Sequence, residues 1–169
     1  MTVSNSSTNW TKYLRWYNGS KAIHSFSDGV DTILLNTTGN LGICFVQKAS
    51  EIDLDPNSYY SLSCEAKCSK SGAQISMARS YYNTSNTWVW RGGSDKQNFN
   101  AVNTWQNFSI TFKPDANTQY ICYCFTCANG TSGGTDTFSI KHCKLEKGSI
   151  ATPWELNTSE DLYETTNIT

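Results

Sequence analysis

The chain is poor in charge, in proline and in long apolar runs, and each shortage excludes a class of protein. Only 16% of its 169 residues are charged and the net charge is −1, so no basic surface is evident that would attract a nucleic acid. No apolar run approaches the roughly 20 residues that a membrane-spanning helix needs. The opening "MTVSNSSTNW" lacks the basic start and apolar stretch of a signal peptide. We therefore expect neither nucleic-acid binding nor membrane insertion.

What the sequence does contain is alternation of apolar and polar residues. In "YYSLSCEAKC" the apolar side chains fall on every second position, which is the pattern of a half-buried strand. Runs of this kind recur between turns rich in Asn, Ser and Gly. The pattern predicts an all-β fold, a two-sheet antiparallel β-sandwich of jelly-roll type. The strands are expected at residues 22–26, 30–35, 41–47, 59–68, 73–82, 87–91, 105–113, 120–127 and 137–146.

The seven cysteines are interpreted as buried apolar side chains, because their number is odd and their spacing suits neither disulfides nor a metal. Cys64 and Cys68 lie on one strand, about 13 Å apart at roughly 3.3 Å per residue. "CYCFTC" resembles a metal clip, but Cys122 and Cys124 point to one face of a strand and Cys127 to the other. We therefore expect free thiols, as in a chain made in a reducing compartment, and disfavour zinc.

The stretch "ARSYYNTSNTWVWRGG" is the best candidate for a binding site, because it gathers flat aromatic rings and arginines around one hairpin. Sugar rings stack on aromatic faces, while polar side chains hydrogen-bond the hydroxyls. Tryptophans in a sandwich more often belong to the core, and that interpretation stays open. The candidate carbohydrate-binding residues are Arg79, Tyr81, Tyr82, Trp88, Trp90 and Arg91.

Four segments in order, "YYSLSCEAK", "TWQNFSITF", "TQYICYCF" and "FSIKHCKLEKGSIATPW", resemble the carbohydrate-binding-module-like β-sandwich domains of bacteriophage tail, baseplate and receptor-binding proteins. The last segment is the most specific. It places Cys143 where the family usually has an aliphatic residue, two positions before Leu145 on the same face. We expect Pro153 to keep Thr152 extended, so that Trp154 folds back over the open end of the sandwich.

The resemblance implies a non-catalytic module that adheres to host cell-surface polysaccharide as part of a virion, the chain being synthesised in the bacterial cytoplasm. Other phage tail proteins would be partners, and a homotrimer is compatible with a tail fibre. Two alternatives stay open: a purely structural spacer or decoration domain of a fibre, and an accessory binding module of a cell-wall hydrolase. The expected organisation is an N-terminal segment at residues 1–20, the sandwich at 21–154, and a linker or the start of a further element at 155–169.

No catalytic constellation accompanies these features. His24 and His142 stand in no motif with a nucleophile, and the acidic residues fall mainly in loops rather than as an opposed pair. Domains of the family often hold a structural calcium. Asp28, Asp31 and Asp136 are candidate contributors, although no compact calcium-binding loop is present.

Overall fold

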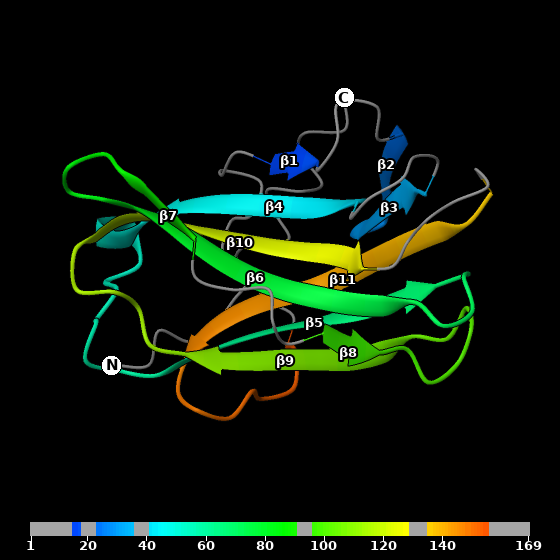
Figure 1. Ribbon diagram of the computed structural model, residues 1–169. Coiled ribbons are helices and arrows are strands. Elements are labelled where there is room, and N and C mark those ends of the chain that lie inside the picture. Colours follow the sequence, from blue (N-terminus) through cyan, green and yellow to red (C-terminus); the bar gives the residue numbers. More distant parts are fainter. Residues whose placement is uncertain (1–14, 18–22, 36–40, 91–95, 129–134, 156–169) are drawn as a thin grey trace.

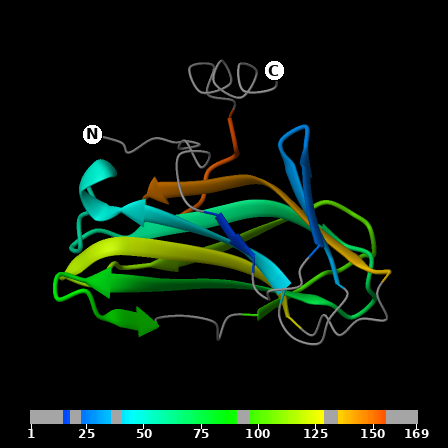
Figure 2. The same cartoon turned by 90° about the horizontal axis from the view of Figure 1, so that it is seen from above.

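The computed structural model describes residues 15–17, 23–35, 41–90, 96–128 and 135–155, and these form two antiparallel sheets packed face to face (Figures 1 and 2). Sheet A has the order β1 (Arg15–Tyr17), β4 (Leu41–Lys48), β10 (Thr118–Ala128), β6 (Gln74–Asn83) and β7 (Trp88–Trp90), with β8 (Lys96–Asn98) also paired to β6. Sheet B has the order β2 (Ile23–Ser27), β3 (Val30–Leu34), β11 (Thr137–Lys147), β5 (Tyr60–Cys68) and β9 (Gln106–Phe112). The predicted jelly-roll sandwich is confirmed.

All nine expected strands are present, with ends that shift by no more than two residues. Three further elements were not predicted. These are β1, β8 and a short 3₁₀ helix at Ala49–Glu51, and each has only three residues, too few to display a period. β1 lies within the expected N-terminal segment, where it pairs with β4 at the edge of sheet A.

The core lies between the sheets and is built from alternate residues of the long strands. On β5, Tyr60, Leu62, Cys64, Ala66 and Cys68 are all at most 3% exposed. From sheet A, Phe45 and Phe125 meet them in an edge-to-face pair with ring centroids 6.2 Å apart. Each large apolar side chain buried in this way contributes roughly 1.5–3 kcal/mol.

A bulge in the middle of β11 changes which residues face the core. The register with β5 shifts between Lys141 and Lys144, and His142 adopts a φ of 52°. Before the bulge Phe138 and Ile140 are buried, and after it Leu145 is. Cys143 packs against the same core cluster, as predicted from its position relative to Leu145.

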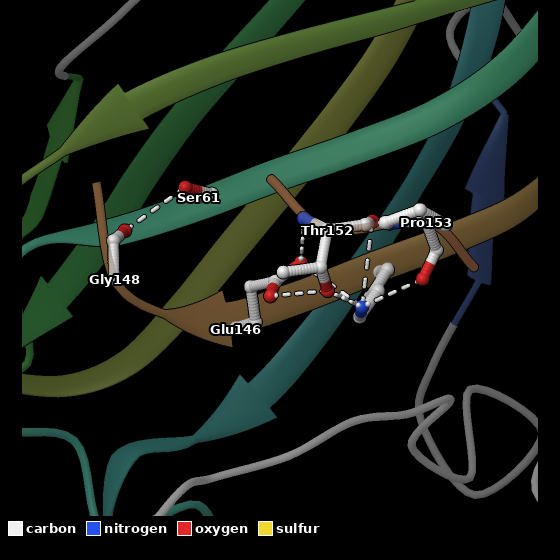
Figure 3. A network of polar contacts seen from close by, with 6 residues as sticks. Ser61, Glu146, Gly148, Thr152 and Pro153 are labelled. Atoms are coloured by element: carbon white, nitrogen blue, oxygen red, sulfur yellow. Dashed lines mark hydrogen bonds and ion pairs between the residues drawn. The ribbon is translucent and has the colours of Figure 1, made fainter. Parts of the chain in front are cut away.

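After β11 the chain folds back, and residues 148–154, here called the C-terminal strap, lie along the outer face of sheet B (Figure 3). Gly148, at φ +144°, makes the turn, and its carbonyl accepts a hydrogen bond from Ser61. Lys144 is only 5% exposed and donates to the carbonyls of Thr152 and Pro153. Thr152 in turn donates to the Glu146 carboxylate from both its N–H and its hydroxyl.

Trp154 belongs to this strap and not to the open end of the sandwich, so the expected plug is wrong in its location. Its ring stacks on His142 at the bulge, with centroids 4.0 Å apart and planes 10° apart. The positive φ of His142 was not readable from the sequence, and it is at this bulge that the imidazole meets the returning strap.

Within the described part of the chain, the structure contains no helix long and apolar enough to cross a membrane.

Candidate functional site

The outer face of sheet A, turned away from the core, carries mainly apolar and uncharged polar side chains, with Lys48 and Lys96 as its charged members. Its members are identified by alternation: Ile43 and Phe45 of β4 point into the core, so Gly42 and Cys44 point outward, and the same logic applies to β6 and β10. With β7 and β8 included, the described side chains of this face are those of Cys44, Lys48, Gln74, Ser76, Ala78, Tyr82, Trp88, Lys96, Asn98, Tyr120, Cys122, Cys124 and Thr126.

An aromatic pair stands at one end of this face. Tyr82 of β6 and Trp88 of β7 are directly opposite in the register, with ring centroids 5.0 Å apart and planes inclined at 64°. Trp88 is 41% exposed. The hairpin between them is fixed by Asn83, whose side-chain oxygen accepts from the backbone N–H groups of Ser85 and Thr87. The rigid turn holds an accessible indole beside a phenol ring.

The other predicted site residues do not all join this pair. Arg79 and Tyr81 alternate with Tyr82 on β6 and therefore face the interior side of sheet A. The Arg79 guanidinium lies 4.6 Å from the centre of the buried Phe112 ring. Trp90 pairs with Ser80 in the register, but its side chain lies outside what the structure describes, as does all of Arg91. Of the predicted site residues whose side chains the structure describes, Tyr82 and Trp88 lie together on the outer face, and Arg79 and Tyr81 do not.

Three thiols meet at the centre of the same face. Cys124 of β10 is directly opposite Cys44 of β4, and Cys122 lies two residues away on the same side. Their sulfurs all lie within 4.8 Å of one another, and each residue is at most 6% exposed. Hydrogen bonding to Cys122 raises the pKa of Cys44, and hydrogen bonding to Cys122 and Cys44, followed by burial, raises that of Cys124.

The sequence interpretation of the cysteines is confirmed in part. Cys127 does face the opposite side from Cys122 and Cys124, and its sulfur lies 3.8 Å from that of Cys68 within the core. None of the seven cysteines, all of which the structure describes, forms a disulfide. What the sequence did not reveal is that Cys44, Cys122 and Cys124 form a second cluster with Ala78, separate from the core between the sheets. The segment "LGICFVQ" is apolar on both faces, which indicated that its outward side is also covered. The sequence did not show that β10 is the neighbouring strand that brings Cys122 and Cys124 to Cys44.

The outer face of sheet B is different, because it carries several charged side chains that pair with one another. Glu65 accepts from His142 at 2.9 Å and pairs with Lys141 at 3.3 Å. Burial alone would raise the pKa of Glu65, but these partners outweigh it and hold the pKa below its ordinary value near 4.5. Lys144 and Glu146 pair at 3.1 Å beneath the strap. Charges on this face are thus largely matched to one another.

The calcium candidates have separate partners. Asp31 is hydrogen-bonded to His24 at 2.8 Å, and Asp136 accepts from the Ser69 hydroxyl at 2.8 Å. Asp28 accepts from Ser27 in an exposed turn. Among the described residues, the thiol cluster is the one group of three or more potential ligands close enough to share an ion, and the aspartates do not form another.

Comparison with known proteins identifies the fold. No protein-family model matches the chain, and no curated protein does. Solved structures do match: the CBM22-1 xylan-binding domain of Paenibacillus barcinonensis Xyn10C has a TM-score of 0.53 at 8% identity, covering 81% of this chain and 87% of that domain. A family 4 carbohydrate-binding module has a TM-score of 0.55 at 17% identity, covering 88% of this chain and 95% of that one. The fold is that of carbohydrate-binding modules.

A phage protein is also among the structural matches. The enzymatically active domain of tailspike protein 4 of bacteriophage CBA120 aligns with a TM-score of 0.54 at 13% identity. The alignment covers 83% of this chain but only 20% of the tailspike chain. The likeness therefore concerns one sandwich domain within a much longer protein.

Proposed function

We propose that this domain is a non-catalytic carbohydrate-binding module whose ligand lies across the outer face of sheet A, with Tyr82 and Trp88 as its aromatic platform. The observation that carries the proposal is the exposed indole of Trp88, held rigidly against Tyr82 by the 83–87 turn. Carbohydrate-binding modules that share the fold support the same assignment.

The mechanism follows from the side chains on this face. A pyranose ring covers the indole with its C–H groups and removes apolar area from water. The amides of Gln74 and Asn98, which bond each other at 2.8 Å at the far end of β6, can exchange that bond for sugar hydroxyls. Trp90 and Arg91 follow Trp88 in the sequence and complete the proposed site. Arg79 and Tyr81 support it from the inner side of β6.

Each of these contacts with a sugar is weak, so firm attachment requires many copies of the domain on one particle. An array of identical modules on one particle converts later binding events into intramolecular ones, so avidity exceeds single-site affinity by factors of about 10²–10⁴. The proposed setting is the phage tail or baseplate, supported by the match to a tailspike domain, and the proposed ligand is host cell-surface polysaccharide. The domain would then act in the virion, in contact with other tail proteins, after synthesis in the bacterial cytoplasm.

Binding to immobilised glycans tests the proposal. The probes are xylohexaose, cellohexaose and purified cell-wall polysaccharide from Gram-positive bacteria. Trp88→Ala should weaken binding by roughly 30-fold, the effect of losing about 2 kcal/mol at the centre of an interface. Tyr59→Ala is the matched control, because Tyr59 is 53% exposed and directly precedes β5 of the other sheet.

The two rival functions give different results. A spacer domain of a fibre would bind none of the probes in either form. An accessory module of a cell-wall hydrolase would bind the cell-wall polysaccharide and would occur in one chain with a catalytic domain, which the complete gene reveals. Binding that survives Trp88→Ala unchanged would reject the assigned platform.

A further inference from the structure

The geometry of the three thiols on sheet A is unusual for cysteines that only fill space. Residues two apart on one side of a strand have backbones roughly 6.6 Å apart, yet the sulfurs of Cys122 and Cys124 approach to 3.8 Å. Both side chains therefore lean toward each other, and Cys44 reaches the same point from the neighbouring strand. Three sulfurs from two strands converge on one centre.

The spacing of the sulfurs fits an ion held in a plane of three. A soft ion about 2.3 Å from each sulfur, the usual zinc–thiolate distance, sets three sulfurs roughly 4.0 Å apart. The observed limits, 3.8 Å for one pair and no more than 4.8 Å for any pair, bracket that value. Small rotations of the three cysteine side chains would bring all three sulfurs to this spacing around an ion.

We propose that Cys44, Cys122 and Cys124 form a binding site for a soft, three-coordinate metal ion, Cu(I). Thiolates select soft ions, of which Cu(I) and Zn(II) are the commonest. Structural zinc takes four protein ligands, and the cluster in the described residues offers three. Cu(I) is satisfied by the three sulfurs alone.

The surroundings suit such an ion. Ala78, directly opposite Cys124 on β6, is the fourth member of the outer cluster, and all four residues are at most 6% exposed. Each sulfur that binds as a thiolate exchanges an S–H bond for an S–Cu bond and releases its proton to solvent, with no change of oxidation state. The bound ion would tie β4 to β10 in the middle of the proposed sugar-binding face, although the site does not depend on that function.

Cu(I) titration of the reduced full chain tests the site, with a chromogenic Cu(I) chelator as competitor and thiolate-to-copper absorption in the near ultraviolet as the signal. One Cu(I) per chain is expected. Cys124→Ala should weaken binding at least 100-fold. Cys127→Ala is the control, because Cys127 and Cys68 form the other close pair of thiols, on the opposite side of sheet A; this variant should retain the site.

Three results would overturn the proposal: no stoichiometric Cu(I) binding, equal binding by the wild type and Cys124→Ala, or loss of binding in Cys127→Ala alone. Circular dichroism verifies that each variant folds. If Cys124→Ala does not fold, X-ray absorption at the copper edge of the wild type decides. Three sulfur neighbours support the site, whereas two, as expected at the Cys68–Cys127 pair, refute it.

Discussion

The outer faces of the two sheets differ in how far their polar and charged side chains pair with one another. On sheet B, Glu65 has His142 and Lys141, Glu146 has Lys144, and the strap lies over this second pair. On sheet A, the described face consists mainly of thiols, aromatic rings and uncharged polar groups, and its described charged members are Lys48 and Lys96. Sheet B therefore satisfies its polar groups internally, which stabilises the fold. Sheet A leaves an accessible aromatic ring for something outside the chain.

The largest effect on stability is expected on sheet A, at Gly42. A Cβ at this position would lie 2.0 Å from the backbone oxygen of Phe125 on β10. Because backbone cannot yield as a side chain does, Gly42→Ala should force β4 away from β10. We expect a loss of about 3 kcal/mol in the free energy of unfolding, measured by urea denaturation.

Gly72→Ala provides the comparison for this variant. Gly72 has a φ of +71°, but its Cβ would meet no atom within 4 Å, so only the backbone strain of roughly 1–2 kcal/mol applies. Equal losses in the two variants would show that the close approach of β4 and β10 does not limit residue size at Gly42.

The next largest effect is expected beneath the strap of sheet B. Lys144→Ala removes the cation that holds the carbonyls of Thr152 and Pro153 and leaves the Glu146 carboxylate without its pair. We expect a loss of about 2 kcal/mol, because a buried group keeps its desolvation cost when its partner is removed. Lys147→Ala, at the exposed pair with Asp55, should cost much less, because water and salt screen an exposed ion pair. Similar losses of unfolding free energy in Lys144→Ala and Lys147→Ala would mean that the contacts of Lys144 with the strap do not stabilise the fold.

A smaller effect is expected for Trp154→Ala, which removes the ring stacked on His142. An aromatic contact of this kind contributes about 1 kcal/mol, so the melting temperature should fall by roughly 3 °C in a chain of this length. Ile150→Ala, in the same strap but 79% exposed, should leave it unchanged. An unchanged melting temperature in Trp154→Ala would show that the stack of Trp154 on His142 does not stabilise the fold.

The smallest effect is the acid dependence of sheet B. Burial alone would raise the pKa of Glu65 and of Glu146. Hydrogen bonds to Glu65 from His142 and Lys141, and to Glu146 from Thr152 and Lys144, outweigh it and hold both pKa values below their ordinary value near 4.5. A carboxyl with a lowered pKa in the folded state stabilises the protein above its unfolded pKa, and that contribution disappears as the pH falls through the folded value.

Thermal unfolding between about pH 5 and pH 3 measures this dependence. The wild type should lose stability over this range, and the Glu65→Gln/Glu146→Gln double variant should lose less. Trp88→Ala, on the other sheet, should keep the wild-type slope. The same slope in all three proteins would contradict the contrast between the faces.

The strands were predictable from the sequence because a half-buried strand repeats every two residues. The outward placement of Ser63, Glu65 and Lys67 and the inward placement of Cys64 follow from that repeat alone. The bulge at His142 was not predictable, since one residue in a left-handed conformation leaves no mark on the pattern. The position of Trp154 depends on that bulge, which is why its contact was predicted at the wrong place.

The candidate site was predictable only within a strand. Alternation placed Cys122 and Cys124 together and Cys127 opposite them. That Cys44 completes the cluster depends on the register of β4 against β10, which is set by contacts between residues 80 positions apart in the sequence. The same alternation separates Arg79 and Tyr81 from Tyr82. Gathering all six candidates at one hairpin disregarded the two faces of the strand.

The most direct test of the central claim, that the outer face of sheet A is the ligand-binding face, is a backbone-amide NMR titration. The protein would be titrated with the glycan that binds best among xylohexaose, cellohexaose and cell-wall polysaccharide fragments. If the ligand binds this face, the largest shift changes will fall on Tyr82, Trp88 and the adjoining residues of β6 and β10. Changes centred on Glu65, Lys144 and the strap, or none with any glycan, would contradict it.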